Sequence, residues 1–291
     1  DCTVTTGFHE FCFDLQTDKD GNFYVNINGH RFHYDVPYCA WTVKISPDGK
    51  MDGFCSGIRS PNGLGVWGPD GDIFMSDNQG NYIGACKLNH LQQGKFYGHP
   101  SSTPAPAYDI KTAVVQPPAI WFPRKLAPSS SGIHEIKDPR FGPFNGQMLV
   151  GDFQNGIVTR VALEKVGGEW QGAVFPFLKG FYSGVNRLAA GPDGKLYVGG
   201  LKRRWGCAAP KSYSLDRVSF SGKTPFEIFA IKALPNGFEM SFTTPLDKAI
   251  AVLPDEYSVD QFTYKYHAAY GSPEFDHNGK QGATSIKVDS A

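Results

Sequence analysis

The chain has 291 residues, and its 28 Lys plus Arg residues balance its 28 Asp plus Glu residues. This length can bury a large core in one or two domains, and the balanced charge gives no basic footprint for a nucleic acid partner. No apolar run approaches the roughly 18 residues that span a membrane. Aromatic residues make up 14%, with 34 Gly and 21 Pro, which favours an all-β, loop-rich protein over a helical bundle.

Four segments repeat a pattern of strand, tight turn and strand. The clearest is residues 57–80, where Val66-Trp67 and Ile73-Phe74-Met75 flank an Asp-Gly turn. Glycine supplies the positive φ that such a hairpin needs. The turns fall at Asp20, Asp70, Asn145 and Asp193, at intervals of 50, 75 and 48 residues. Two intervals match the period of a β-propeller blade, and the third leaves room for an insertion.

The units follow in chain order. Residues 1–56 give the first, residues 57–98 the second, and the third and fourth begin near Ala119 and Gly184. Between the second and third, residues 100–118 are crowded with Pro, Ser and Ala and predict a long surface insertion. No segment shows a long helical period. We therefore expect residues 1–236 to form a β-propeller of four to six blades.

The pattern changes from Gly237, where alternating strands continue without the Asp-Gly spacing. Residues 237–291 are therefore expected to form a C-terminal β extension. This extension either closes the propeller ring or begins an immunoglobulin-like sandwich, which needs about seven strands. The second interpretation implies further domains in a longer parent chain.

Six cysteines are present, and none has a CxxC or Cys/His metal spacing. Cys39 and Cys55 lie on either side of the turn at Asp48-Gly49, so facing hairpin strands would bring them to disulfide distance. We predict this bridge; the other four cysteines allow three connectivities, and six buried thiols are the alternative. A disulfide would indicate a secreted or periplasmic location.

Several segments resemble a known family. SPNGLGVWGPDGDIFMSDNQGN, followed by KLNHLQQGKFYGHP, is similar to bacterial extracellular propellers of the glucose/sorbosone dehydrogenase-like superfamily, whose multidomain members are often fused to a haem domain. GQMLVGDFQNGIVTRVALE and GVNRLAAGPDGKLYVGG extend the resemblance, which covers residues 11–275. It implies a sugar dehydrogenase dependent on the quinone PQQ, whose three carboxylates are held by a His, a Lys and several Arg. His30, Lys125 and Arg187 would take these roles.

The chain departs from this family pattern at two places. The family's Arg-x-Arg before a Pro-Asp-Gly turn is reduced here to Arg187, and its Glu-His-Gly is replaced by residues 77–80, Asp-Asn-Gln-Gly. The same stretch also resembles lactonase-type propellers, in which Pro-Asn-Gly supplies an Asn ligand to a cation in the central channel. That resemblance implies that Asn62 and Asn186 face the channel, and that Asn62 and Asp77 bind Ca²⁺ or another divalent cation.

The leading functional prediction is hydrolysis of a glycosidic bond. Asp77 and Asp152 follow equivalent strands and share the pattern Asp-x-Gln, and paired carboxylates provide acid/base catalysis of this reaction. An Asp in this position also commonly caps a turn. His30 lies in a polar loop and is the third catalytic candidate. The candidate residues for substrate binding are Asn62, Asn186, Arg187, Gln79, Gln154 and Trp205.

Three functions are therefore considered. The first is a secreted or periplasmic glycoside hydrolase that acts on a polysaccharide or oligosaccharide. The second is a PQQ-dependent sugar dehydrogenase. The third is a propeller that binds carbohydrate or protein without catalysis. All three predict a chain without a nucleic acid partner or a membrane span.

Overall fold

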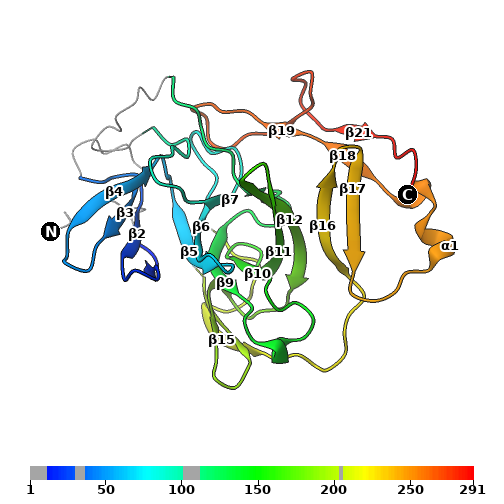
Figure 1. The fold of residues 1–291 in the computed structure, drawn as a ribbon, viewed down its shortest axis with the longest axis horizontal. Coiled ribbons are helices and arrows are strands. Elements are labelled where there is room, and N and C mark those ends of the chain that lie inside the picture. The colour runs from blue at the N-terminus through cyan, green and yellow to red at the C-terminus, as the bar shows by residue number, and fades with distance from the viewer. Residues whose placement is uncertain (1–11, 30–36, 101–111, 203–205) are drawn as a thin grey trace.

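The structure is a computed structural model that describes residues 12–29, 37–100, 112–202 and 206–291 (Figure 1). Almost all regular elements in these ranges are β-strands. The helical elements among them are short: η1 (Pro139–Phe141), α1 (Lys248–Ala251) and η2 (Pro254–Glu256). The expectation of an all-β protein is confirmed.

Four antiparallel sheets, called blades 1 to 4, follow one another along the described chain. Blade 1 contains β1 (Gln16–Thr17), β2 (Phe23–Ile27), β3 (Trp41–Ile45) and β4 (Met51–Ser56). Blade 2 contains β5 (Pro61–Trp67), β6 (Asp72–Asp77), β7 (Lys87–His90) and β8 (Ile120–Trp121). Blade 3 contains β9 (Ser130–Glu135), β10 (Met148–Asp152), β11 (Ile157–Val166) and β12 (Glu169–Leu178). Blade 4 contains β13 (Gly184–Ala190), β14 (Leu196–Leu201) and β15 (Tyr213–Val218).

The first strand of each blade is its inner strand, and neighbouring inner strands pack against each other. β1 contacts β5, β5 contacts β9, and β9 contacts β13. Glycines make this close approach possible, because a Cβ atom on Gly63 would lie 2.2 Å from the Ser131 carbonyl oxygen. A Cβ atom on Gly132 would lie 2.8 Å from the Asn186 carbonyl oxygen. Successive sheets that meet at their inner strands form a β-propeller, as predicted.

Apolar side chains fill the spaces between neighbouring blades. Phe74 and Met75 are adjacent on β6 and are fully buried, although strand geometry sends them to opposite faces. Met75 packs in the cluster that also contains Tyr24 of blade 1, and Phe74 packs in the cluster that contains Met148 of blade 3. Blade 2 is therefore buried on both faces.

The chain beyond residue 226 leaves the blades. β16 (Ile228–Leu234) and β17 (Gly237–Phe242) form a hairpin that contacts β11 and β12. The boundary expected after residue 236 falls in the turn of this hairpin, and the division into two domains stays a prediction. Two short strand pairs follow: β18 (Val259–Gln261) with β21 (Thr284–Ile286), and β19 (Thr263–Tyr264) with β20 (Glu274–Phe275).

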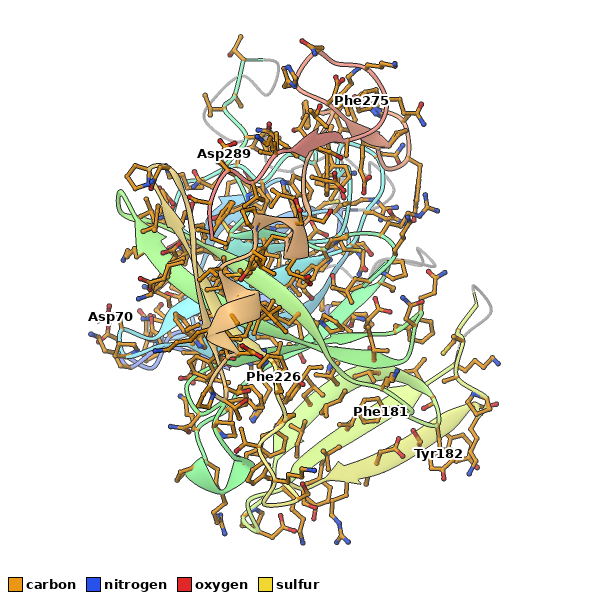
Figure 2. The ribbon with its side chains drawn as sticks, turned by 90° about the vertical axis from the view of Figure 1, so that its right-hand side faces the viewer. Asp70, Phe181, Tyr182, Phe226, Phe275 and Asp289 are labelled. Atoms are coloured by element: carbon orange, nitrogen blue, oxygen red, sulfur yellow. The ribbon has the colours of Figure 1, made fainter. Side chains whose placement is uncertain are left out.

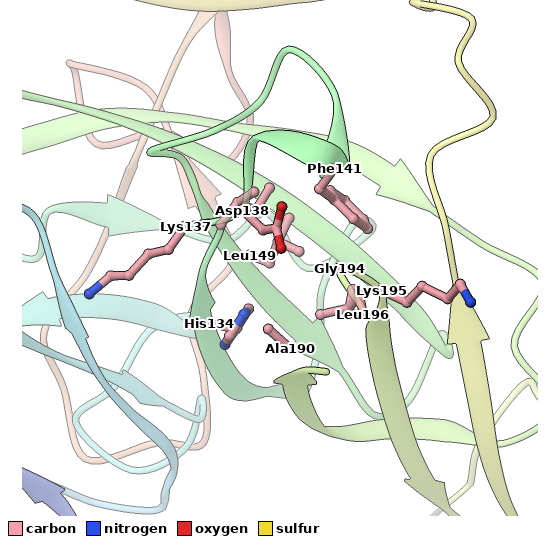
Figure 3. Close-up of a pocket in the computed structure, with 10 residues that line it drawn as sticks. His134, Lys137, Asp138, Phe141, Leu149, Ala190, Gly194, Lys195 and Leu196 are labelled. Carbon is pink, nitrogen blue, oxygen red and sulfur yellow. The ribbon is translucent and has the colours of Figure 1, made fainter. Parts of the chain in front are cut away.

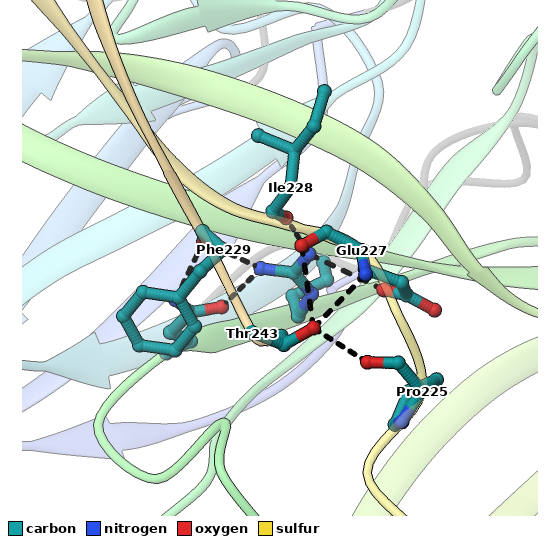
Figure 4. Close-up of polar contacts among 7 residues, drawn as sticks. Pro225, Glu227, Ile228, Phe229 and Thr243 are labelled. Atoms are coloured by element: carbon teal, nitrogen blue, oxygen red, sulfur yellow. Dashed lines mark hydrogen bonds and ion pairs between the residues drawn. The ribbon is translucent and has the colours of Figure 1, made fainter. Parts of the chain in front are cut away.

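Arg160 on β11 attaches this hairpin to blade 3. Its side chain is completely buried, and its guanidinium donates to the carbonyl oxygens of Ile228 at 2.6 Å and Phe229 at 2.8 Å (Figure 4). The guanidinium also lies 4.5 Å from the centroid of the Phe144 ring. Glu227 is its charged partner, at 3.4 Å. The hairpin is therefore held by hydrogen bonds to its backbone as well as by apolar contacts.

Residues 263–275, called the C-terminal strap, return to blade 2. Gly271 N donates to the Gly80 carbonyl oxygen at 3.0 Å, and Ser272 N donates to that of Gly84 at 2.8 Å. In Figure 1 this orange segment crosses the top of the molecule, the end at which the inner strand β5 begins. Figure 2 shows Phe275 of the strap near the top, far from Phe181 and Tyr182, which lie in the loop between β12 and β13.

The predicted disulfide between Cys39 and Cys55 is not formed. Cys55 is a free thiol, and burial raises its pKa to about 12. The register of β3 and β4 places Cys55 opposite Thr42, whereas Cys39 lies before β3 and its Sγ donates to the Asn28 carbonyl oxygen at 3.7 Å. Cys86 and Cys207 are also free thiols, and Cys2 lies outside the described residues. The Cys39–Cys55 pair therefore gives no support for an oxidising compartment.

No helix in the described part of the chain has the length and apolar character needed to cross a membrane.

Candidate functional site

Polar side chains from three blades meet near the beginnings of the inner strands. Arg187 Nε lies 2.9 Å from Asp14 Oδ1, and Arg187 Nη1 donates to Asn62 Oδ1 at 3.0 Å. Asn62 Nδ2 in turn donates to Asn186 Oδ1 at 3.1 Å. We call these four residues the axial cluster. They come from distant parts of the chain, so only the circular arrangement of the blades brings them together.

Irregular pairing at equivalent positions aims the two amides of the cluster. The register between the first two strands of blade 2 shifts between Pro61 and Gly63, so that Asn62 is the extra residue. In blade 4 the register shifts between Val185 and Arg187, so that Asn186 is the extra residue. A β-bulge of this kind re-aims a side chain. The repeated sequence therefore produces a repeated bulge, and the bulge produces the contact.

The axial cluster contains one positive and one negative side chain, and both are partly accessible. The Arg187 side chain is 34% exposed and that of Asp14 is 19% exposed. Burial raises the pKa of Asp14, although Arg187 and a hydrogen bond from Leu64 oppose this shift. Burial lowers the pKa of Arg187, against the effect of Asp14. The Phe13 ring lies 5.1 Å from the guanidinium, so the cluster combines donors, acceptors and an aromatic surface.

Asp77 and Asp152 have a different arrangement, at the ends of β6 and β10. Asp77 accepts from Arg59 N at 3.0 Å and from Ser60 N at 2.7 Å. Asp152 accepts from Ser129 N and from Asn155 N, both at 2.6 Å. Both aspartates are fully buried. Each carboxylate therefore ties the loop before an inner strand to the neighbouring strand, and a substrate in solution has no access to it.

Burial also sets the protonation of these carboxylates. It raises the pKa of Asp152 to about 7, against the opposing effect of the backbone donors. Burial raises the pKa of Asp77, and Lys87, its cross-strand partner, opposes the shift. Lys87 is itself buried, which lowers its pKa to about 8, and its Nζ donates to the Tyr97 carbonyl oxygen at 2.6 Å.

Arg59 lies beneath the C-terminal strap. Its Nη1 donates to the Gln79 carbonyl oxygen at 2.7 Å, and the Tyr270 ring covers the guanidinium at 5.2 Å. A Cβ atom on Gly80 would lie 1.9 Å from Arg59 Nε, so only glycine leaves room for this side chain. Arg59 is 3% exposed. With the strap in place, this arginine is closed off from solvent.

The structure thus brings together Asn62, Asn186 and Arg187 from the predicted site. Gln79 is buried, whereas Gln154 is exposed. His30 and Trp205 lie outside the described residues.

Sequence reasoning missed Asp14, Phe13 and Arg59. Asp14 and Phe13 stand just before the first strand of the repeat in blade 1, as Asn62 stands at the start of β5. Their position within the repeat was therefore the available signal.

The described residues do not fit PQQ or a cation. A quinone with three carboxylates needs several convergent cationic side chains. Arg187 is already paired with Asp14, and Arg59 is closed off by the strap. For a cation, the Asn62 and Asn186 side-chain oxygens accept hydrogen bonds instead, and the described ranges contain no metal-binding group of three or more His, Cys, Asp or Glu.

A small cavity lies at the other end of the inner strands, between β9 and the β13–β14 turn (Figure 3). Its volume is about 20 Å³, with His134, Phe141 and Leu196 in its lining. This volume holds about one water molecule, so a sugar does not fit.

Comparisons with known proteins agree with the fold. The family model described as glucose/sorbosone dehydrogenase matches residues 43–202. A solved glucose dehydrogenase is 19% identical, with a TM-score of 0.57, over 75% of this chain and 66% of that one. PQQ-bound aldose sugar dehydrogenase from Streptomyces coelicolor is 17% identical, with a TM-score of 0.54, over 72% and 62%. An oxidoreductase assigned as a glucose dehydrogenase, from Thermus thermophilus, is 20% identical, with a TM-score of 0.51, over 70% and 63%.

These structural similarities show the fold, and the chain spans just under two thirds of the length of each structure. No curated protein matches the chain.

The prediction of a glycoside hydrolase is wrong. The matching family model describes dehydrogenases, which oxidise sugars and do not cleave glycosidic bonds. The buried environment of Asp77 and Asp152 gives the physical reason, because both carboxylates bind loop amides in place of an acid/base role.

Proposed function

We propose, from the premise that this chain belongs to the glucose/sorbosone dehydrogenase family, that it serves the oxidation of an aldose and binds the sugar at the axial cluster. The observation that carries this proposal is the convergence of a carboxylate, a guanidinium and two amides from three blades at an accessible place. The repeated bulges support it, because they aim both amides at one point.

The cluster has the chemistry that a sugar needs. Each sugar hydroxyl donates one hydrogen bond and accepts others, and the Asp14 carboxylate accepts while Arg187 and Asn62 donate. Nε and Nη1 of Arg187 are engaged within the cluster, and Nη2 carries two further N–H donors that can bind a sugar oxygen. The Phe13 ring offers an apolar surface to the C–H face of the sugar. These contacts would bind and orient the ring without any further group.

Oxidation also needs an electron acceptor, and its identity stays a prediction. PQQ is bound in the structure from Streptomyces coelicolor. The described residues of this chain do not supply the cations for PQQ, so roles for His30 and Lys125, and a site for calcium, remain hypotheses. A secreted or periplasmic location is part of the same proposal, and fractionation of the producing cells tests it.

The pairing of Arg187 with Asp14 favours a second candidate, a propeller that binds sugar without turnover. The two candidates predict the same binding site and differ only in catalysis. An assay that reports binding and oxidation separately therefore distinguishes them.

The test is saturation-transfer NMR on the purified chain with glucose, galactose, xylose and sorbitol, followed by dye reduction with PQQ and calcium added. We expect saturation transfer to at least one aldose, and its loss in the double variant Asn62→Ala/Asn186→Ala. Asn278→Ala, in an exposed turn, is the matched control. Aldose binding with dye reduction supports the dehydrogenase, and binding alone supports the second candidate. Absence of aldose binding, or binding unchanged in the double variant, contradicts the proposed site.

A further inference from the structure

We propose that Asp14 makes the axial cluster selective for neutral sugars over sugar acids, because it neutralises Arg187, the cation of this cluster. This inference rests on the proposed function and adds the substrate class. It concerns a residue outside the range 43–202 that the family model matches.

Asp14 is held in place from several sides. Its backbone has a φ of 59°, in the left-handed region that few residues other than glycine adopt. Its Oδ2 accepts from Leu64 N at 3.1 Å, and its Oδ1 lies 2.9 Å from Arg187 Nε. Gln16 Nε2 donates to the Leu64 carbonyl oxygen at 3.0 Å, which fixes the start of blade 1 beside β5. The Asp14 carboxylate therefore has a fixed position in the site.

The guanidinium of Arg187 is held equally firmly. Its Nη1 donates to Asn62 Oδ1 at 3.0 Å and to the Asn186 carbonyl oxygen at 2.7 Å. With Nε on Asp14, the cation is fully oriented before a ligand arrives. Burial lowers the pKa of Arg187 and the charge of Asp14 opposes this shift, whereas burial raises the pKa of Asp14 and the charge of Arg187 opposes that one.

The charge balance of this pair decides the ligand class. A neutral sugar needs only donors and acceptors, and the paired site offers both. A sugar acid brings a carboxylate of its own. This carboxylate would have to compete with the Asp14 carboxylate for the Arg187 guanidinium, and the two carboxylates would repel each other. Partial burial strengthens that repulsion, because screening by water and salt is weaker there. The intact pair therefore rejects the acid and accepts the neutral sugar.

Asp14→Asn tests the inference, because the amide keeps one acceptor oxygen for Leu64 N, removes the negative charge and puts an NH2 group in place of the oxygen that faces Arg187. Binding of glucose and of glucuronate is measured by calorimetry at low salt for both proteins. Wild type should prefer glucose, and Asp14→Asn should bind glucuronate about tenfold more tightly than wild type does, the effect of one charge-assisted hydrogen bond. Asp20→Asn, an exposed aspartate in the following turn, controls for the overall charge and should leave the preference unchanged.

Arg187→Gln is the second variant, since it leaves Asp14 as an unpaired anion. It should prefer glucosamine, a cationic sugar, over glucose. Thermal unfolding checks that both variants fold.

The outcomes separate the two proposals. If wild type binds no aldose, the proposed function fails and the inference falls with it. If wild type binds glucose but neither variant changes its charge preference, the selectivity role of Asp14 is overturned while the sugar site stands.

Discussion

Buried carboxylates such as that of Asp152 affect the stability of this protein through hydrogen bonds with backbone amides. Asp152 binds two amides of the loops beside it, and burial raises its pKa to about 7. The usual pKa is 3.8, so the folded protein holds this proton more tightly than the unfolded chain. The stability contributed by protonation is complete below pH 3.8 and is lost as the pH rises through about 7.

Asp152→Asn should therefore change how stability depends on pH. As the pH rises from 4 to 8, the midpoint temperature of thermal unfolding should fall for the wild type relative to the variant. Asparagine retains one acceptor oxygen, so we expect a cost of about 1 kcal/mol at low pH, where one amide hydrogen bond is lost. Thermal unfolding at several pH values checks this, with the exposed Asp70→Asn as the control. Parallel curves for wild type and Asp152→Asn would show that the carboxylate does not titrate in this range.

The hairpin of β16 and β17 depends on a neighbouring strand. An isolated two-stranded hairpin is only marginally stable in water. Arg160 of β11 donates to two carbonyl oxygens of this hairpin, and the Phe144, Phe175 and Phe177 rings surround its guanidinium. This side chain therefore makes a main attachment of the hairpin to blade 3, beside the bond from Gln147 to Phe229.

Arg160→Met should loosen the hairpin and destabilise the protein by about 1–3 kcal/mol, because the Ile228 carbonyl oxygen loses its donor, whereas that of Phe229 keeps Gln147. Urea unfolding measures the cost, and hydrogen exchange of the amides in residues 228–242 locates it. Lys232→Met removes an exposed cation from the same hairpin, and its effect should stay within about 0.5 kcal/mol. Equal effects of the two substitutions would contradict the anchoring role of Arg160.

The inner strands impose a separate constraint, since they touch through backbone atoms. Gly63→Ala would place a methyl group against the Ser131 carbonyl oxygen and should cost about 1–3 kcal/mol, as overpacked sites do. Gly199→Ala is the matched control, because its Cβ would meet nothing closer than 3.9 Å. Urea unfolding of both variants gives the comparison. A Gly63→Ala protein as stable as the control would mean that blades 2 and 3 can move apart freely.

At the scale of the whole molecule, the C-terminal strap covers the loop after β6. A Cβ atom on Gly84 would lie 2.7 Å from Tyr264 Cβ, so Gly84→Ala should push the strap outward. Overpacking of about 1.4 kcal/mol raises the open population about tenfold, and trypsin cleavage after Lys265 should accelerate by a similar factor. Gly199→Ala serves again as the control. Unchanged cleavage would show that the strap is held mainly elsewhere.

The repeated hairpins made the propeller predictable, because a turn and its flanking strands are encoded locally. That Asn62 and Asn186 lie near each other could be predicted for the same reason, since both positions belong to the repeat. The role of Asp14 could not be predicted, because its partner lies in blade 4 and only the folded arrangement of the blades brings the two residues together.

The predicted disulfide failed because positions on either side of a turn do not fix the register of the two strands. The pairing of β3 and β4 shifts between Thr42 and Val43. The roles given to Asp77 and Asp152 failed because an Asp after a strand can bind loop amides as readily as a substrate.

The strap also has a consequence for the order in which the protein is made. Asn81 Nδ2 donates to the Ala268 carbonyl oxygen at 2.7 Å, across 187 residues of sequence. A ribosome adds about 5–20 residues per second, so blade 2 waits on the order of ten to forty seconds for the segment that covers it. During that interval the nascent chain exposes the Arg59 guanidinium and the loop around Gly80. Chaperones that bind growing chains would meet this surface, although the finished protein hides it.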